Sequence, residues 1–143
     1  MPKFYQMRDS LLESVEQEGD RVLMNLRAIR AEIAAGSRRP ADTLRQEIRL
    51  VLEGAQLSVD SANWPSWLLE GALTAEVLDA DPGDCGVKGT IPVSLRAASG
   101  VELVLSGLHE GSGDFVTIRV RAGSLRLEPL SEPQSLQHTR ATI

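Results

Sequence analysis

The chain has 143 residues, a formal net charge of −5 at pH 7 and only 3% aromatic residues. Its length suits one domain of ordinary size, and its 42% hydrophobic content is too high for a wholly disordered protein. No apolar run approaches the ~20 residues that a membrane-spanning helix needs, and the first ten residues lack the apolar core of a signal peptide. A single cysteine excludes an internal disulfide. We therefore expect a cytoplasmic domain.

The negative charge is distributed unevenly. Residues 1–56 carry nine basic and nine acidic side chains, whereas residues 57–143 carry six basic and eleven acidic ones. An acidic surface repels phosphate backbones, and no basic stripe is present to counter this. Nucleic acid is therefore not an expected partner.

Residues 1–56 predict a pair of helices. Ser10 and Glu13 have the spacing of a helix-capping box. After them, apolar residues recur in alternating steps of three and four, the spacing of a heptad seam. The seam comprises Leu12, Val15, Gly19, Val22, Leu26, Ile29 and Ile33. Thr43 and Gln46 begin a second, shorter stripe, and the short connection between the two favours an antiparallel helical hairpin.

Residues 57–130 predict an antiparallel meander. Apolar and polar residues alternate in short runs separated by glycine, proline and aspartate, as in strands with one buried face. Gly100 and Gly123 are interpreted as parts of hairpin turns between such runs. Pro92 interrupts one run and is expected on an edge strand or at a bulge, because it has no N–H to donate. Five or six strands of this kind form a curved sheet or a small barrel.

The predicted fold class is therefore α+β. An N-terminal helical hairpin, residues 1–56, is followed by a five- to six-stranded antiparallel meander, residues 57–130, and the two pack as one domain. Residues 131–143 show no apolar period and are expected to form a mobile tail.

Trp64 and Trp67 bracket Pro65 at the junction of the two regions. Tryptophan is enriched at interface hot spots, so the pair is a candidate for contact with a partner. The alternative is that the pair plugs one end of the sheet, which a core poor in aromatic residues would need. The sequence supports both interpretations.

The remaining candidate metal-binding and catalytic residues have weaker support from the sequence. Asp79, Asp81 and Asp84 could bind calcium, but they depart from the EF-hand pattern and also suit an exposed acidic turn, which we favour. Cys85 follows this turn, where the neighbouring acids disfavour a thiolate nucleophile. His109 is interpreted as a turn residue, because no nucleophile elbow accompanies it.

Without a catalytic constellation, we expect a non-enzymatic protein that needs no cofactor. The favoured function is protein–protein interaction, as an accessory, adaptor or assembly component that docks through the N-terminal helices onto another protein or a second copy. The contact residues would be Leu12, Val15, Val22, Leu26, Ile29, Ile33, Trp64 and Trp67. The alternative is a small-molecule or metal-binding module that uses the β region and the tryptophan segment. Membranes are not an expected partner.

Overall fold

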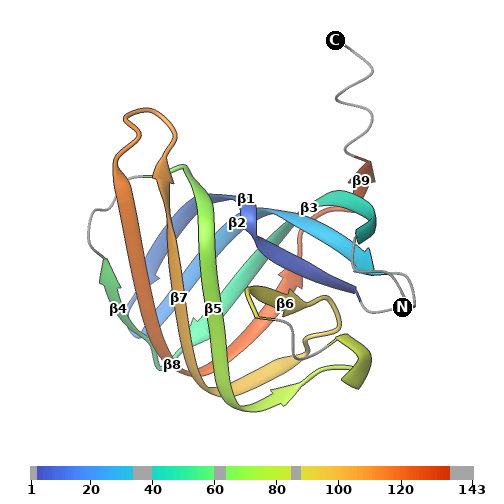
Figure 1. The fold of residues 1–143 in the computed structure, drawn as a ribbon. Coiled ribbons are helices and arrows are strands. Elements are labelled where there is room, and N and C mark those ends of the chain that lie inside the picture. Colours follow the sequence, from blue (N-terminus) through green and yellow to red (C-terminus); the bar gives the residue numbers. More distant parts are fainter. Residues whose placement is uncertain (1–2, 34–39, 60–63, 85–87, 136–143) are drawn as a thin grey trace.

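The computed structural model describes residues 3–33, 40–59, 64–84 and 88–135, with the backbone alone at 33 and 40–42. This part of the chain is almost entirely β-strand (Figure 1). The strands are β1 (Lys3–Glu18), β2 (Arg21–Ile33), β3 (Pro40–Glu53), β4 (Gln56–Val59), β5 (Ser66–Asp79), β6 (Thr90–Pro92), β7 (Ala97–His109), β8 (Phe115–Pro129) and β9 (Gln134–Ser135). The one helical element among the described residues is a short 3₁₀ turn, η1 (Pro82–Asp84).

The predicted N-terminal helical hairpin is wrong, because β1, β2 and β3 occupy this region. β1 and β2 form an antiparallel hairpin with Glu18 opposite Arg21. The spacing that indicated a heptad seam contains a strand pattern as well, since residues two apart share one face of a strand. From Val22 to Ala28 the buried residues of β2 follow this period of two: Val22, Met24, Leu26 and Ala28.

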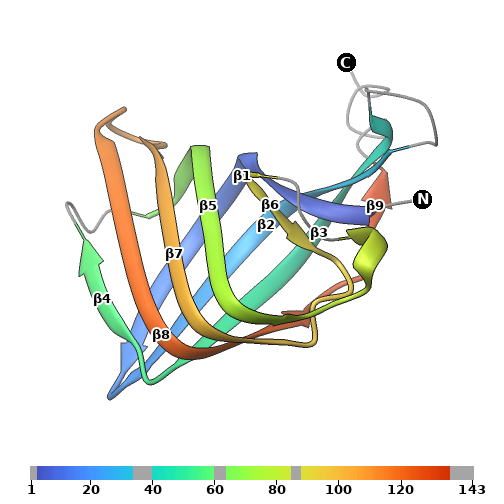
Figure 2. The same cartoon turned by 60° about the horizontal axis from the view of Figure 1, so that its bottom comes forward.

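Six strands close into an antiparallel barrel in the order β1, β2, β3, β8, β7 and β5, with β5 returning to β1 (Figures 1 and 2). The barrel therefore draws half of its strands from the region predicted to be helical, and the fold class is all-β rather than α+β. β4 continues along β8 in the register of β3, and β6 pairs with β1. β9 pairs with β3, so the predicted tail belongs to the sheet as far as Ser135.

A row of glycines marks the bend in the barrel wall. Gly123 of β8 and Gly100 of β7 lie on neighbouring strands, and Gly54 lies in the short connection between β3 and β4. The Gly123 N–H donates to the Gly54 C=O (3.3 Å). Gly54 and Gly100 have φ angles of 62° and 60°, which a residue with a Cβ adopts only at a cost. β5, β7 and β8 curve together at this level (Figure 2). The predicted turns at Gly100 and Gly123 are therefore wrong, because both residues are bends inside long strands.

The barrel interior is filled by apolar side chains from all six barrel strands and from β6. The largest fully buried ones are Leu12, Met24, Ile48, Leu50, Leu52, Leu68, Ile91, Leu103, Leu105, Ile118, Leu125 and Val22. At one end the Tyr5 hydroxyl donates to Gln46 Oε1 (2.8 Å), and Arg30 Nη1 donates to the same oxygen (3.2 Å). Burial raises the pKa of Tyr5, and the charge of Arg30 partly opposes this.

A bulge in β1 opens the wall between β1 and β5. Residues 7–10 of β1 lie opposite a single residue of β2, and Asp9 within them has a φ of 68°. The Ser10 hydroxyl fixes the bulge by donating to the Gln6 C=O (2.6 Å) and accepting from the Ile29 N–H (3.0 Å). On one side of the bulge β1 pairs with β6, and on the other it pairs with β5 at Leu11 and Leu12 only. Most of β5 therefore lacks a strand partner on its β1 side in the described chain.

Candidate functional site

The residues of the predicted seam do not form a surface. Three of them are buried in the barrel core: Leu12, Val22 and Leu26. Val15 packs against the same core and is partly buried, whereas Ile29 lies on the opposite face of β2. Ile33 ends β2, and its side chain lies outside the described residues. The seam positions therefore stabilise the barrel, and the buried ones are inaccessible to a partner.

The two tryptophans occupy different environments. Trp64 is partly buried and packs against the core, as a plug would. Trp67 is 41% exposed on β5. The segment between them is held to the β7–β8 hairpin, because the Glu110 N–H donates to the Pro65 C=O (3.0 Å). Of the pair, Trp67 is the one available to a partner.

An apolar row crosses three neighbouring strands on the outside of the barrel. Leu108 lies opposite Trp67 of β5 on one side and opposite Phe115 of β8 on the other. Directly opposed side chains have Cβ atoms about 4.5–5.5 Å apart, so the three form one continuous patch. Leu108 is 38% exposed and Phe115 is 57% exposed. We name Trp67, Leu108 and Phe115 the outer apolar row.

Acidic side chains border the outer apolar row. Glu110 and Asp114 lie in the loop that joins β7 to β8, and Glu70 follows Trp67 along β5. All three are exposed, and none forms an ion pair with another described residue. The apolar row therefore has a negatively charged rim.

His109 helps to build the loop at this end of the barrel. Its Nδ1 accepts the Ser112 N–H (3.1 Å) and lies 2.9 Å from the Ser112 hydroxyl. That hydroxyl accepts the Asp114 N–H (3.2 Å), and the His109 N–H donates to the Asp114 C=O (2.8 Å). The Asp114 carboxylate makes none of these bonds, so the arrangement is a folded loop rather than a catalytic triad.

The three aspartates of the acidic turn are engaged by the chain's own donors. Arg96 donates to Asp79 Oδ1 through Nη2 (2.8 Å) and Nε (3.2 Å), and its Nη1 lies 3.4 Å from Asp81 Oδ1. The hydrogen bond from Arg96 holds the pKa of Asp79 below its usual range. Asp84 Oδ1 accepts the Lys3 N–H (2.8 Å).

These contacts leave little support for the calcium interpretation. No group of three or more metal-ligating side chains gathers in the part of the chain that the structure describes. Cys85, next to the turn, lies outside that part.

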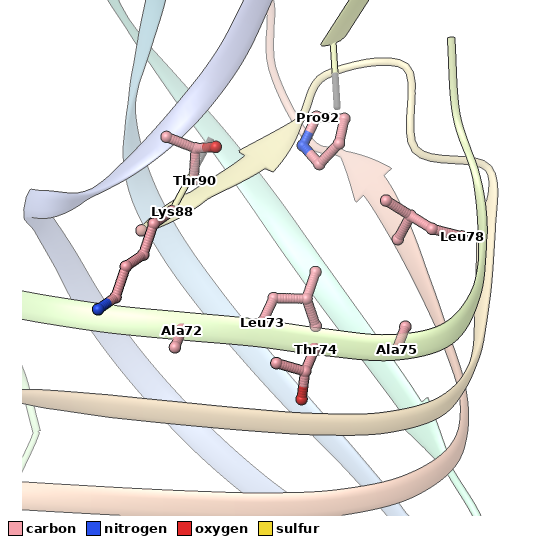
Figure 3. Close-up of a pocket in the computed structure, with 9 residues that line it drawn as sticks. Ala72, Leu73, Thr74, Ala75, Leu78, Lys88, Thr90 and Pro92 are labelled. Carbon is pink, nitrogen blue, oxygen red and sulfur yellow. The ribbon is translucent and has the colours of Figure 1, made fainter. Parts of the chain in front are cut away.

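A hollow of about 540 Å³ lies where the barrel wall opens, and we name it the β5–β6 groove (Figure 3). Its described lining is mostly apolar and comprises Ala72, Leu73, Thr74, Ala75, Leu78, Lys88, Gly89, Thr90 and Pro92. The Lys88 side chain extends toward β5 beside Ala72 (Figure 3). Pro92 ends β6, which among the described strands pairs with β1 alone. Of the two predicted positions for this proline, an edge or a bulge, the edge is confirmed.

Sequence reasoning identified Trp67 but missed Leu108, Phe115 and the groove. A signal for Leu108 was present, because Leu103 and Leu105 alternate toward the core and Leu108 falls in the outward phase beside the loop. Phe115 directly follows the loop and showed no period of its own. The groove had no local signal, since it depends on where β1 leaves β5.

Comparison with known proteins gave no match to a family model, a curated protein or a solved structure. Among the described residues, no helix has the length and apolar character needed to cross a membrane.

Proposed function

We propose that this protein is a non-enzymatic interaction module that binds a partner protein through the outer apolar row. The observation that carries the proposal is the exposure of Trp67, Leu108 and Phe115 as direct cross-strand neighbours. One outward row further along the same three strands is polar and comprises Thr74, Glu102 and Arg121. Large apolar side chains are thus concentrated at one end of the wall, as expected for the centre of an interface.

The acidic rim specifies the chemistry of the partner. Glu70, Glu110 and Asp114 have no ion-pair partner among the described residues, so basic residues on a partner could approach them without displacing an existing pair. The complementary surface is an apolar patch bordered by lysine or arginine. A stable interface buries roughly 800 Å² on each side, so the rim must contribute area as well as charge.

The alternative of a metal-binding module has less support. Asp79 and Asp81 already pair with Arg96, and the barrel interior is filled by the core. A cytoplasmic setting is part of the proposal, and the supporting observation is the single cysteine.

Quantitative affinity capture from the native source tests the proposal. The test variant carries Leu108→Ser with Phe115→Ser, and the matched control carries Val77→Ser, which changes a 62% exposed residue beyond the bend of β5. Both should remain folded, because Val77 and Phe115 are mostly exposed and each cross-strand contact of Leu108 contributes only about 0.2–1 kcal/mol; circular dichroism of the variants checks this. A partner captured by the wild type and the control, and lost by the test variant, supports docking through the row. The same partners at the same yield from all three proteins would refute it.

Analytical ultracentrifugation of the same three proteins identifies self-association. If the partner is a second copy, the wild type and the Val77→Ser control form dimers and the test variant is monomeric. A dimer that persists in the test variant would place self-association elsewhere on the barrel.

A further inference from the structure

The β5–β6 groove exposes a strand edge as well as a pocket. Consecutive residues of a strand point to opposite faces, yet all four residues from Ala72 to Ala75 line the groove. The groove therefore faces the edge of β5. The other edge of β5 pairs with β7 along its length, whereas on the groove side no described strand pairs with β5 beyond Trp67.

The strand edge decides which kind of ligand suits the groove. An edge presents a row of backbone N–H and C=O groups, and covering such groups without replacing their hydrogen bonds costs free energy. A purely apolar ligand would displace water from these groups without forming hydrogen bonds to them. An extended peptide supplies matching C=O and N–H groups and adds to the sheet as a further strand.

One end of the groove is closed and carries a positive charge. An ideal Cβ on Gly89 would lie 3.7 Å from the Gly71 carbonyl oxygen, so β5 and the start of β6 meet there. Lys88 extends toward β5 at this end (Figure 3), is exposed and forms no ion pair with a described residue. The adjoining hollow is lined by two basic side chains, Arg8 and Lys88, and by one acidic side chain, Glu70. The net charge at the closed end is therefore positive.

We propose that the β5–β6 groove binds the free C-terminus of a polypeptide as a short strand added to β5, with the terminal carboxylate at Lys88. β5 runs away from the closed end, from Gly71 to Leu78. A peptide whose last residue lies at the closed end therefore runs antiparallel to β5, as every other strand pair in the barrel does. This site is separate from the outer apolar row and does not depend on the function proposed above.

The volume of the groove limits how much of the peptide it holds. About 540 Å³ accommodates roughly eighteen non-hydrogen atoms if each takes ~30 Å³, which corresponds to about two to three residues. Leu73, Leu78 and Pro92 line the groove, so one of these residues should have an apolar side chain.

Binding of random pentapeptides tests the proposal. One library has free C-terminal carboxyl groups and its twin has C-terminal amides. We expect enrichment from the free-acid library alone, and about three- to fivefold weaker binding when an enriched peptide is amidated. Lys88→Glu should weaken binding by about tenfold, because it removes the attraction and adds repulsion. The matched control is Arg119→Glu, which makes the same charge change at an exposed arginine of β8 without an ion pair among the described residues, and it should bind within about twofold of the wild type.

The mode of binding is tested on the peptide, so that protein folding is not affected. Methylating backbone nitrogens one at a time should weaken binding at alternate positions, because alternate N–H groups of an added strand face β5. Amide NMR shifts should change at residues 72–78 and 88–90. The proposal is overturned if neither library yields a binder, if acid and amide bind equally, if Lys88→Glu behaves like Arg119→Glu, or if no N-methylation weakens binding.

Discussion

Replacing Gly54 by alanine tests whether the bend in the barrel wall requires a left-handed backbone. Gly54 has a φ of 62°, and the nearest atom to an added Cβ would be the Gly123 nitrogen at 3.5 Å, an ordinary contact. The cost of the substitution is therefore the backbone cost alone, about 1–2 kcal/mol. Gly123 is a matched control, because its φ is not positive and its added Cβ would meet the Glu53 carbonyl oxygen at the same 3.5 Å.

The comparison between the two variants isolates this backbone cost. Both substitutions reduce the flexibility of the unfolded chain, which favours alanine by about 0.4–1 kcal/mol in each case and cancels in the difference. Gly54→Ala should therefore have a free energy of unfolding about 1–2 kcal/mol below that of Gly123→Ala. Urea denaturation followed by circular dichroism measures the difference, which corresponds to roughly 2–8 °C in Tm for a chain of this size. Equal stability of the two variants, or greater stability of Gly54→Ala, would refute the reasoning.

Three further predictions concern the core and the titrating groups. Leu26→Ala should lower the free energy of unfolding by about 2–5 kcal/mol, because it leaves a cavity in the core, and a loss below about 0.5 kcal/mol in urea denaturation would place Leu26 on a surface. Tyr5→Phe should cost about 0.5–1.5 kcal/mol at neutral pH through the lost hydrogen bond to Gln46. Because burial raises the pKa of Tyr5 above 10.0, the free energy of unfolding of the wild type should also fall as the pH rises above that value. If the free energies of unfolding of wild type and Tyr5→Phe change in parallel between neutral and alkaline pH, this prediction is wrong. NMR titration of Asp79 should give a pKa below 3.8 in the wild type, and the Arg96→Gln variant should raise this pKa toward 3.8. The ion pair stabilises the fold above pH 3.8, and this stabilisation is lost as the pH falls through the lowered pKa. An unchanged pKa of Asp79 in the variant would exclude the pair.

Most strands within residues 57–130 could be predicted from the sequence. Alternation around Leu103 and Leu105 and around Ile118 and Val120 identified core-facing strands, and Pro92 was predicted on an edge or at a bulge, of which the structure shows the edge. The connections were misread, because glycine at a bend inside a strand and glycine in a turn look alike in a sequence. Only the neighbouring strands show that the row through Gly100 is a bend.

The N-terminal half was misread because two periods coincide. Val22 and Leu26 are four residues apart, which suits one face of a helix and one face of a strand equally. The segment is also rich in leucine, arginine and glutamate, which have high helix propensity. Met24 and Ala28 complete the strand pattern. The pairing of β2 with both β1 and β3 stabilises the strand over the helix.

The candidate sites were only partly predictable. Trp67 was identifiable by residue type, because tryptophan is enriched at interface hot spots, but only the structure shows that it is exposed and that Trp64 is not. Its neighbours Leu108 and Phe115 lie about 40 to 50 positions away in the sequence, and cross-strand register alone brings them together. The groove at Lys88 depends on the bulge in β1, a feature with no local sequence signature.

The sequence by itself determined a net charge of −5, a single cysteine and strands in the second half that bury one face. These properties follow from composition and local alternation, which need no knowledge of distant residues. The tertiary structure decided that the first half is also β-strand, that six strands close into a barrel and that Trp67 faces outward beside Leu108 and Phe115. The physical reason is that strand pairing satisfies backbone hydrogen bonds between segments far apart in the chain, so it can override local helix propensity.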